Sequence, residues 1–177
     1  TLTVAINTSS TADTKYDALS SQSVSITTND DEASPLVTLT ASSSSVAENG
    51  GTSTLTATQN VATASNTTVN LNTSGNATLN ADYSISSSAI TISAGSTSGT
   101  ATLTAITDQL DDDGEAIVVD ISSVSGANSV AENGTQQTTV TITDDDNASF
   151  TVTQTSGSTI VDESGSADNF TVVLGSP

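Results

Sequence analysis

Small hydrophobic residues alternate with polar residues along much of this chain, and a period of two is the pattern of half-buried β-strands. The alternation occurs in eight segments: Leu2–Ile6, Val24–Ile26, Val37–Leu39, Val69–Leu71, Ile90–Ile92, Ile117–Ile121, Val140–Ile142 and Phe150–Val152. Threonine usually fills the positions between, and its β-branched side chain favours extended backbone with a polar outer face. Turn-forming residues separate the segments at intervals of about ten residues. The sequence therefore predicts an all-β, antiparallel sandwich without helices.

Composition limits the core of this sandwich. Only 33% of the 177 residues are hydrophobic and 2% are aromatic, so the core must be thin and built from small aliphatic side chains. The absence of cysteine excludes disulfides, thiolate chemistry and zinc–sulfur sites. No apolar run is long enough to span a bilayer. Because the chain begins without Met or a signal peptide, we expect it to be a segment of a larger protein.

Acidic residues dominate the charge of the chain. Twenty Asp and Glu face a single basic residue, Lys15, and the net charge is −19. Three acidic clusters lie at predicted turns: Asp30-Asp31-Glu32, Asp111-Asp112-Asp113 and Asp144-Asp145-Asp146. Like charges held together in a turn repel, and Ca²⁺ binds carboxylate and carbonyl oxygens in irregular geometry. The clusters favour calcium binding, although acidic turns are commonly solvated loops in which Asp bonds locally, and a saline exterior also selects acidic surfaces.

The same composition argues against several classes of function. A chain without His or Cys cannot build a Ser-His-Asp triad, a cysteine nucleophile or a zinc centre, and a carboxylate pair for glycoside hydrolysis lacks aromatic platforms. We therefore expect no enzyme. A phosphate backbone requires Lys and Arg that are missing, so we expect no nucleic-acid partner. We also expect no direct insertion into membranes.

The chain repeats itself at an offset of 115 to 116 residues. The strand at 23–27 matches 139–143, both lead through acids into another strand, and the strand at 2–6 matches 117–121. We predict the closing strands of one repeat at 1–32, a complete domain at 33–146 and the opening strands of another repeat at 147–177. The hexapeptide Ser45–Gly50 recurs as Ser129–Gly134, but the strands flanking its copies do not match. We therefore place Glu132 in a hairpin loop and not in a metal site.

Four motifs occur in order across about 110 residues. They are Val46-Ala47-Glu48-Asn49-Gly50, Ala81-Asp82-Tyr83, Ile106-Thr107-Asp108 followed by Asp111 to Glu115 and Ile117, and Ile142-Thr143-Asp144-Asp145-Asp146. Together they resemble the Calx-beta domain, an immunoglobulin-like calcium-binding repeat of sodium/calcium exchangers, integrin β4 and large bacterial surface proteins. Two departures are Gln109, where the family has a second Asp, and Ile117, where it has an aromatic residue.

The resemblance implies an immunoglobulin-like sandwich with Ca²⁺ sites at one end. The implied ligands are Glu48, Asp82, Asp108, one or more of Asp111 to Asp113, and the terminal Asp144, Asp145 and Asp146. Asp113 is preferred over Asp111, because it lies closest to the acidic position of the family pattern. Asp30, Asp31 and Glu32 occupy the positions of Asp144 to Asp146 in the preceding repeat and could bind Ca²⁺ at the first junction between repeats. Asp162 and Glu163 lie near the start of the following repeat, where Glu163 matches Glu48. Tyr83 is expected to fill the core or an edge.

We expect a Ca²⁺-rigidified stalk segment of a secreted or cell-surface adhesin whose partners are neighbouring repeats. An alternative is the subunit of an extracellular fibre, in which 1–32 of one copy pairs with 147–177 of another by strand addition. A second alternative is a calcium-dependent carbohydrate-binding module with a surface or glycan target. The lack of Cys and Met suits an oxidising exterior.

Overall fold

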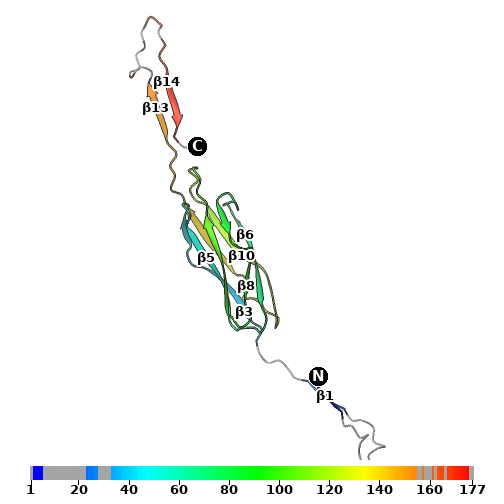
Figure 1. Cartoon of the computed structure of the whole chain (residues 1–177). Helices are drawn as coiled ribbons and strands as arrows, with labels where there is room; N and C mark the ends of the chain where they lie inside the picture. The colour runs from blue at the N-terminus through cyan, green and yellow to red at the C-terminus, as the bar shows by residue number, and fades with distance from the viewer. Residues whose placement is uncertain are drawn as a thin grey trace, which may run out of the picture. The chain divides into compact units, whose positions relative to one another are not determined.

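The computed structural model describes residues 2–5, 23–27, 33–154, 157, 161, 163–165 and 167–175. The chain divides into two compact units, residues 1–33 and 34–177. In the first unit, β1 (Leu2–Ala5) pairs with β2 (Ser23–Ile26) as an antiparallel hairpin. The second unit contains a β-sandwich and a separate two-stranded sheet (Figure 1).

Two five-stranded sheets form the sandwich. The first consists, in order, of β4 (Ser45–Ala47), β12 (Gln137–Thr143), β10 (Ala116–Ser125), β6 (Thr67–Gly75) and β8 (Ala89–Ile92). The second consists of β11 (Ala131–Glu132), β3 (Leu36–Ala41), β5 (Thr52–Gln59), β9 (Ser98–Ala105) and β7 (Tyr83–Ile85). Each sheet is antiparallel except for one edge strand, β4 or β11, which runs parallel to its neighbour. The predicted all-β sandwich is confirmed.

The core lies between the two sheets and follows the predicted alternation. Its most enclosed side chains include Leu55, Leu103, Ile117 and Val140, each with none of its surface exposed. Tyr83 is 2% exposed, which confirms it as a core residue. Threonines occupy the outward positions of the central strands β5 and β9. The core is therefore built largely from aliphatic side chains, as the composition requires.

The remaining sheet pairs β13 (Phe150–Gln154) with β14 (Phe170–Leu174) in antiparallel register. Every residue of both strands is exposed. Among the described residues, no helix has the length and hydrophobicity needed to cross a membrane.

The two copies of the hexapeptide both form edge strands. The first supplies β4, which runs parallel to β12, and the second supplies β11, which runs parallel to β3. The prediction that Glu132 lies in a hairpin loop was wrong, because the backbone of this residue pairs with Val37 in the second sheet. Val46 and Val130 are both buried, so each copy anchors its edge strand to the core through the same valine.

Candidate metal centre

Strand pairing brings the acidic segments to one end of the sandwich. Thr143, the last residue of β12, pairs with Ala47 at the end of β4, and Tyr83 at the start of β7 pairs with Ala105 at the end of β9. The acids that follow or precede these positions are therefore neighbours. We call this end, with its residues Glu48, Asp82, Asp108, Asp112, Glu115, Asp144, Asp145 and Asp146, the acidic pole.

A tight turn after β4 directs Glu48 inward. Gly51 N–H donates to the Ala47 carbonyl at 2.9 Å, and Gly50 has a left-handed φ of +72°. A Cβ on Gly51 would lie 2.4 Å from the Ala47 oxygen, so only glycine fits this close approach. The Glu48 N–H donates to the Thr143 carbonyl at 3.0 Å, which continues the parallel pairing with β12. As a result Glu48 is only 4% exposed.

The carboxylate of Glu48 is only half satisfied. Its Oε1 accepts a hydrogen bond from the Asp108 N–H at 2.6 Å, whereas its buried Oε2 has no hydrogen-bond donor among the described residues. Asp144 lies beside it, but two ionised carboxylates are both acceptors and cannot satisfy each other. The Asp108 N–H lowers the pKa of Glu48, but burial and the charges of Asp108 and Asp144 outweigh it and raise the pKa. A buried, unpaired carboxylate is costly unless a cation accompanies it.

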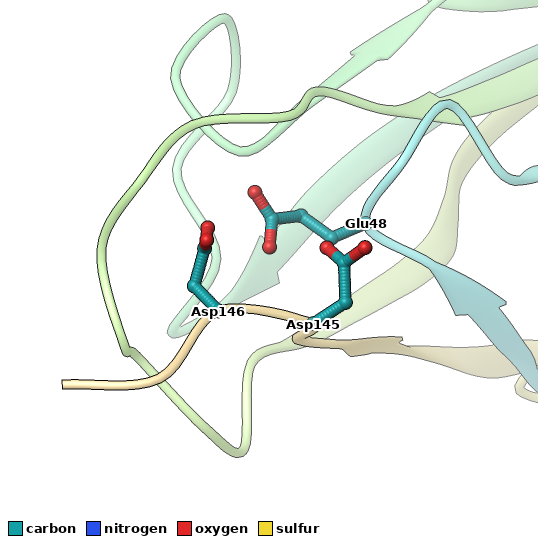
Figure 2. Close-up of side chains that lie close together, drawn as sticks. All are labelled: Glu48, Asp145 and Asp146. Atoms are coloured by element: carbon teal, nitrogen blue, oxygen red, sulfur yellow. The ribbon is translucent and has the colours of Figure 1, made fainter. Parts of the chain in front are cut away.

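Two further carboxylates lie close to Glu48. Ligand oxygens of Glu48, Asp145 and Asp146 all lie within 4.8 Å of one another. Figure 2 shows the three side chains converging, Glu48 from the turn after β4 and the two aspartates from the segment after β12. Partial burial and the charges of Asp144 and Asp145 raise the pKa of Asp146. The group therefore concentrates negative charge around a buried oxygen that lacks a donor.

A second part of the acidic pole centres on Asp82 and Glu115. The Asp82 carboxylate accepts the Thr78 N–H and lies beside the Glu115 side chain. Burial, the hydrogen bond that protonated Glu115 can donate to Asp82, and the charge of Asp82 raise the pKa of Glu115 to about 7. Burial and the charges of Asp108, Asp144 and Asp82 raise the pKa of Asp112. These shifts show that the carboxylates are close enough to oppose one another's ionisation.

The structure gathers most of the predicted ligands at this end. Glu48, Asp145 and Asp146 form the compact group, while Asp108 and Asp144 adjoin Glu48, and Asp82 adjoins Glu115. Asp113 is exposed, and its role as a ligand stays a prediction. Asp30, Asp31, Glu32 and Asp162 lie outside the described residues, and Glu163 is exposed.

Two members of the acidic pole, Asp112 and Glu115, were not singled out by the sequence analysis. Glu115 immediately precedes β10. Its position two residues before Ile117, within the third of the four motifs, could have identified it from the sequence. Asp112 was one of the three consecutive aspartates considered, but the family pattern favoured Asp113, which is exposed, whereas Asp112 is partly buried. Asp111, their neighbour, accepts the Ala148 N–H at 2.8 Å and so ties the acidic loop to the segment leaving β12.

The donor set suits a hard divalent cation. All side chains of the acidic pole offer carboxylate oxygens, and neither His nor Cys exists in the chain to provide nitrogen or sulfur. Ca²⁺ prefers such oxygens and accepts about six to eight of them. The Glu48 carboxylate, whose Oε2 has no donor among the described residues and which lies close to Asp145 and Asp146, fits a ligand position for that ion.

The family profile of the Calx-beta domain matches residues 29–146, which is more than half of the chain. The chain belongs to the Calx-beta family. No curated protein matches it. Among solved structures, CBD12 from CALX1.2 matches the Calx-beta fold of this chain with a TM-score of 0.54 and 19% identity, over 63% of this chain and 44% of that one. The apo-form Calx CBD1 domain matches with a TM-score of 0.52 and 18% identity, over 63% of this chain and 99% of that one.

These likenesses establish a shared fold, since both identities are low. The chain spans less than half the length of the first of the two structures.

Proposed function

We propose that the acidic pole of this Calx-beta domain binds Ca²⁺, and that the bound ion stabilises the sandwich and stiffens its connection to the following segment. The observation that carries the proposal is the Glu48 carboxylate, which is 4% exposed, has one oxygen without a donor among the residues that the structure describes, and lies within 4.8 Å of two further carboxylates. Membership of the Calx-beta family and the oxygen-only donor set support the same ion.

Bound calcium should also reduce the repulsion between the neighbouring carboxylates of the acidic pole. Without a cation, Glu48, Asp112, Glu115 and Asp146 all have raised pKa values, so their ionised forms destabilise one another. A divalent ion offsets this repulsion in the folded state, and the unfolded chain has no preformed site. Calcium binding is therefore coupled to folding. We assign the chain a structural role and no catalytic one.

The experiment is a calorimetric titration of the metal-free chain with Ca²⁺, compared with the same titration of Glu48→Gln. We expect saturable binding by the wild type and at least an approximately tenfold weaker affinity for the variant. Glu132→Gln is the matched control, because it makes the same change within the same hexapeptide outside the acidic pole. Absence of binding by the wild type would refute the proposal.

At the level of the whole protein, the segment would be part of an extracellular stalk. Calcium is abundant outside cells, and extracellular modules bind it with Kd values of about 10⁻⁴ to 10⁻³ M. Asp146 belongs to the three-carboxylate group, and two residues later the Ala148 N–H donates to Asp111. An ion at the acidic pole would therefore hold the first residues that follow the sandwich. Adjacent repeats, joined by such segments, are the partners we propose.

The stiffening is tested by ¹⁵N relaxation of residues 147–149 with and without calcium. We expect the order parameters of these amides to rise toward about 0.85 when Ca²⁺ is bound. Equal order parameters in both states, with calcium binding intact, would remove the stiffening role while leaving the metal site.

A further inference from the structure

Both copies of the hexapeptide end in the dipeptide Asn-Gly, at Asn49-Gly50 and Asn133-Gly134. In this dipeptide the backbone nitrogen of the glycine can attack the side-chain amide carbon of the asparagine, because glycine has no Cβ to obstruct the approach. Both asparagines are exposed, so water reaches their side-chain amides. The two sites differ in how firmly the structure holds the peptide group that must rotate for the attack.

The second copy holds its asparagine firmly. The Asn133 N–H donates to the Val37 carbonyl at 2.9 Å, and the Asn133 carbonyl accepts the side-chain N–H of Gln136 at 2.6 Å. The Gly134 N–H donates to the Glu132 carbonyl at 3.1 Å. Rotation of the peptide group between Asn133 and Gly134 therefore breaks two hydrogen bonds, one at its carbonyl and one at its N–H.

The first copy holds its asparagine less firmly. Among the described residues, neither the N–H nor the carbonyl of Asn49 has a hydrogen-bond partner. The Gly50 N–H donates to the Glu48 carbonyl at 2.6 Å, as the equivalent group does in the second copy. Rotation of the peptide group between Asn49 and Gly50 therefore breaks one hydrogen bond. The bond that the first copy lacks is the one that Gln136 supplies in the second.

We propose that Asn49 is a site of spontaneous deamidation and that it reacts about fivefold faster than Asn133, the factor that one additional hydrogen bond of ordinary strength represents. In the first step the Gly50 nitrogen bonds to the side-chain amide carbon of Asn49. The Gly50 proton leaves with the amide nitrogen as ammonia, and a succinimide ring is closed. In the second step water adds to one of the two ring carbonyls and opens the ring, which gives aspartate or isoaspartate.

The reaction changes the turn that positions Glu48. Either product places a new carboxylate beside Glu48 in the sequence, and isoaspartate also lengthens the main chain by one methylene group. The turn has little room for this group, because the Gly51 N–H closes it on the Ala47 carbonyl at 2.9 Å and even a Cβ on Gly51 would lie 2.4 Å from that oxygen. Isoaspartate at position 49 should therefore displace Glu48 and weaken calcium binding. This consequence rests on the proposed function, whereas the deamidation itself does not.

Peptide mapping by mass spectrometry tests the proposal. The metal-free chain is incubated in EDTA at mildly alkaline pH and sampled over days. Each conversion replaces –NH₂ by –OH and changes the peptide mass accordingly, and fragmentation by electron transfer distinguishes isoaspartate from aspartate. We expect product at Asn49 to accumulate about fivefold faster than product at Asn133. Asn49→Gln, whose longer side chain closes a ring far more slowly, should remove the product at position 49 and leave the rate at Asn133 unchanged.

Gln136→Met tests the structural reason for the difference. The variant removes the donor to the Asn133 carbonyl without adding a charge, so it should raise the rate at Asn133 toward that at Asn49 and leave Asn49 unaffected. Its melting temperature is the folding control, because Gln136 also accepts the Leu39 N–H at 3.3 Å. The comparison of the two asparagines in the wild type needs no variant. Equal rates at the two positions, or no product at Asn49, would overturn the proposal.

The effect on calcium is measured separately. Ion exchange separates the deamidated chain, which carries one more negative charge, from the unreacted chain, and both are titrated with Ca²⁺. We expect the isoaspartate form to bind severalfold more weakly. Equal affinities would exclude the effect on Glu48 while leaving the deamidation site in place. Absence of binding by the unreacted chain would instead refute the proposed function, and the rates at the two asparagines would stand independently of it.

Discussion

The two copies of the hexapeptide Ser-Val-Ala-Glu-Asn-Gly have the same sequence and each contributes an edge strand and a left-handed glycine, but their glutamates have different surroundings. In both copies the valine is buried, the glycine has a left-handed φ of +72° or +71°, and its N–H donates to the glutamate carbonyl. Glu132 accepts the Gln136 N–H and is partly exposed. Glu48 is buried, with one oxygen lacking a donor, among the aspartates that follow β12.

This comparison separates what a local sequence determines from what the fold determines. The hexapeptide fixes an edge strand and a turn in both places, because its valine and glycine satisfy the same local requirements. The acidic neighbours of Glu48 come from segments about 60 and 100 residues away, which only the strand order brings together. Within the part of the chain that the structure describes, no such acidic group surrounds Glu132, and its carboxylate accepts the Gln136 N–H.

Calcium removal should give the largest effect. At a free Ca²⁺ concentration of about 100 times Kd, one site adds about 2.7 kcal/mol to the free energy of unfolding. For a domain of this size, that increment corresponds to a rise of about 10 °C in melting temperature. Thermal unfolding in EDTA and in excess calcium measures the difference. Equal melting temperatures would show that calcium does not stabilise the fold and that the acidic residues form a solvated surface.

The same Glu→Gln change in the two hexapeptides should have different effects on the melting temperature. In EDTA Glu48→Gln should melt a few degrees above the wild type, because it removes a buried charge whose pKa is raised by its surroundings. In calcium it should lose most of the stabilisation that the wild type gains. Glu132→Gln should respond to calcium as the wild type does, since an amide oxygen can still accept the Gln136 N–H. Identical changes in melting temperature for the two variants would contradict the assignment of different roles to Glu48 and Glu132.

The pH dependence of the metal-free protein should come mainly from Glu115. Its pKa is about 7 in the folded state against 4.5 in the unfolded state, so between these values the folded protein binds more protons. Stability in EDTA should therefore fall by a few degrees in melting temperature between about pH 5 and pH 8. Glu115→Gln should flatten this dependence. Calcium should reverse its sign, because binding requires ionised carboxylates.

Glu132→Ala should give the smallest effect. It removes the acceptor of one backbone N–H, which costs about 1 kcal/mol. The loss should be the same in EDTA and in calcium, because Glu132 lies outside the acidic pole. Chemical denaturation in both conditions measures it. A loss confined to the calcium-bound protein would show that this hexapeptide is coupled to the metal site.

The sequence predicted the fold class well where buried side chains were large. Period-two segments such as Val37–Leu39 and Ile117–Ile121 lie on strands with those residues inward. Strands β5 and β9 were absent from the predicted segments because several of their inward positions are Ser or Ala, among them Ser53 and Ala101. Small side chains give little hydrophobic contrast, so their burial becomes visible only once the sheets are paired.

The candidate site was predictable in its segments but not in its contacts. The motif containing Glu48 and the acids that follow β12 pointed to a shared end of the sandwich, and the structure places them there. The partnership of Asp82 with Glu115 depends on how the loop before β10 folds, which no short motif specifies. Among the three consecutive aspartates the family pattern favoured Asp113, whereas Asp112 is the one that lies near Asp82, Asp108 and Asp144.

A crystal structure of the calcium-bound chain, with the ion located by anomalous scattering, tests the central claim most directly. The account predicts a Ca²⁺ ion about 2.3–2.6 Å from Glu48 Oε2, with oxygens of Asp145 and Asp146 in the same coordination sphere. Calcium bound only to exposed aspartates, with Glu48 outside its coordination sphere, would contradict it.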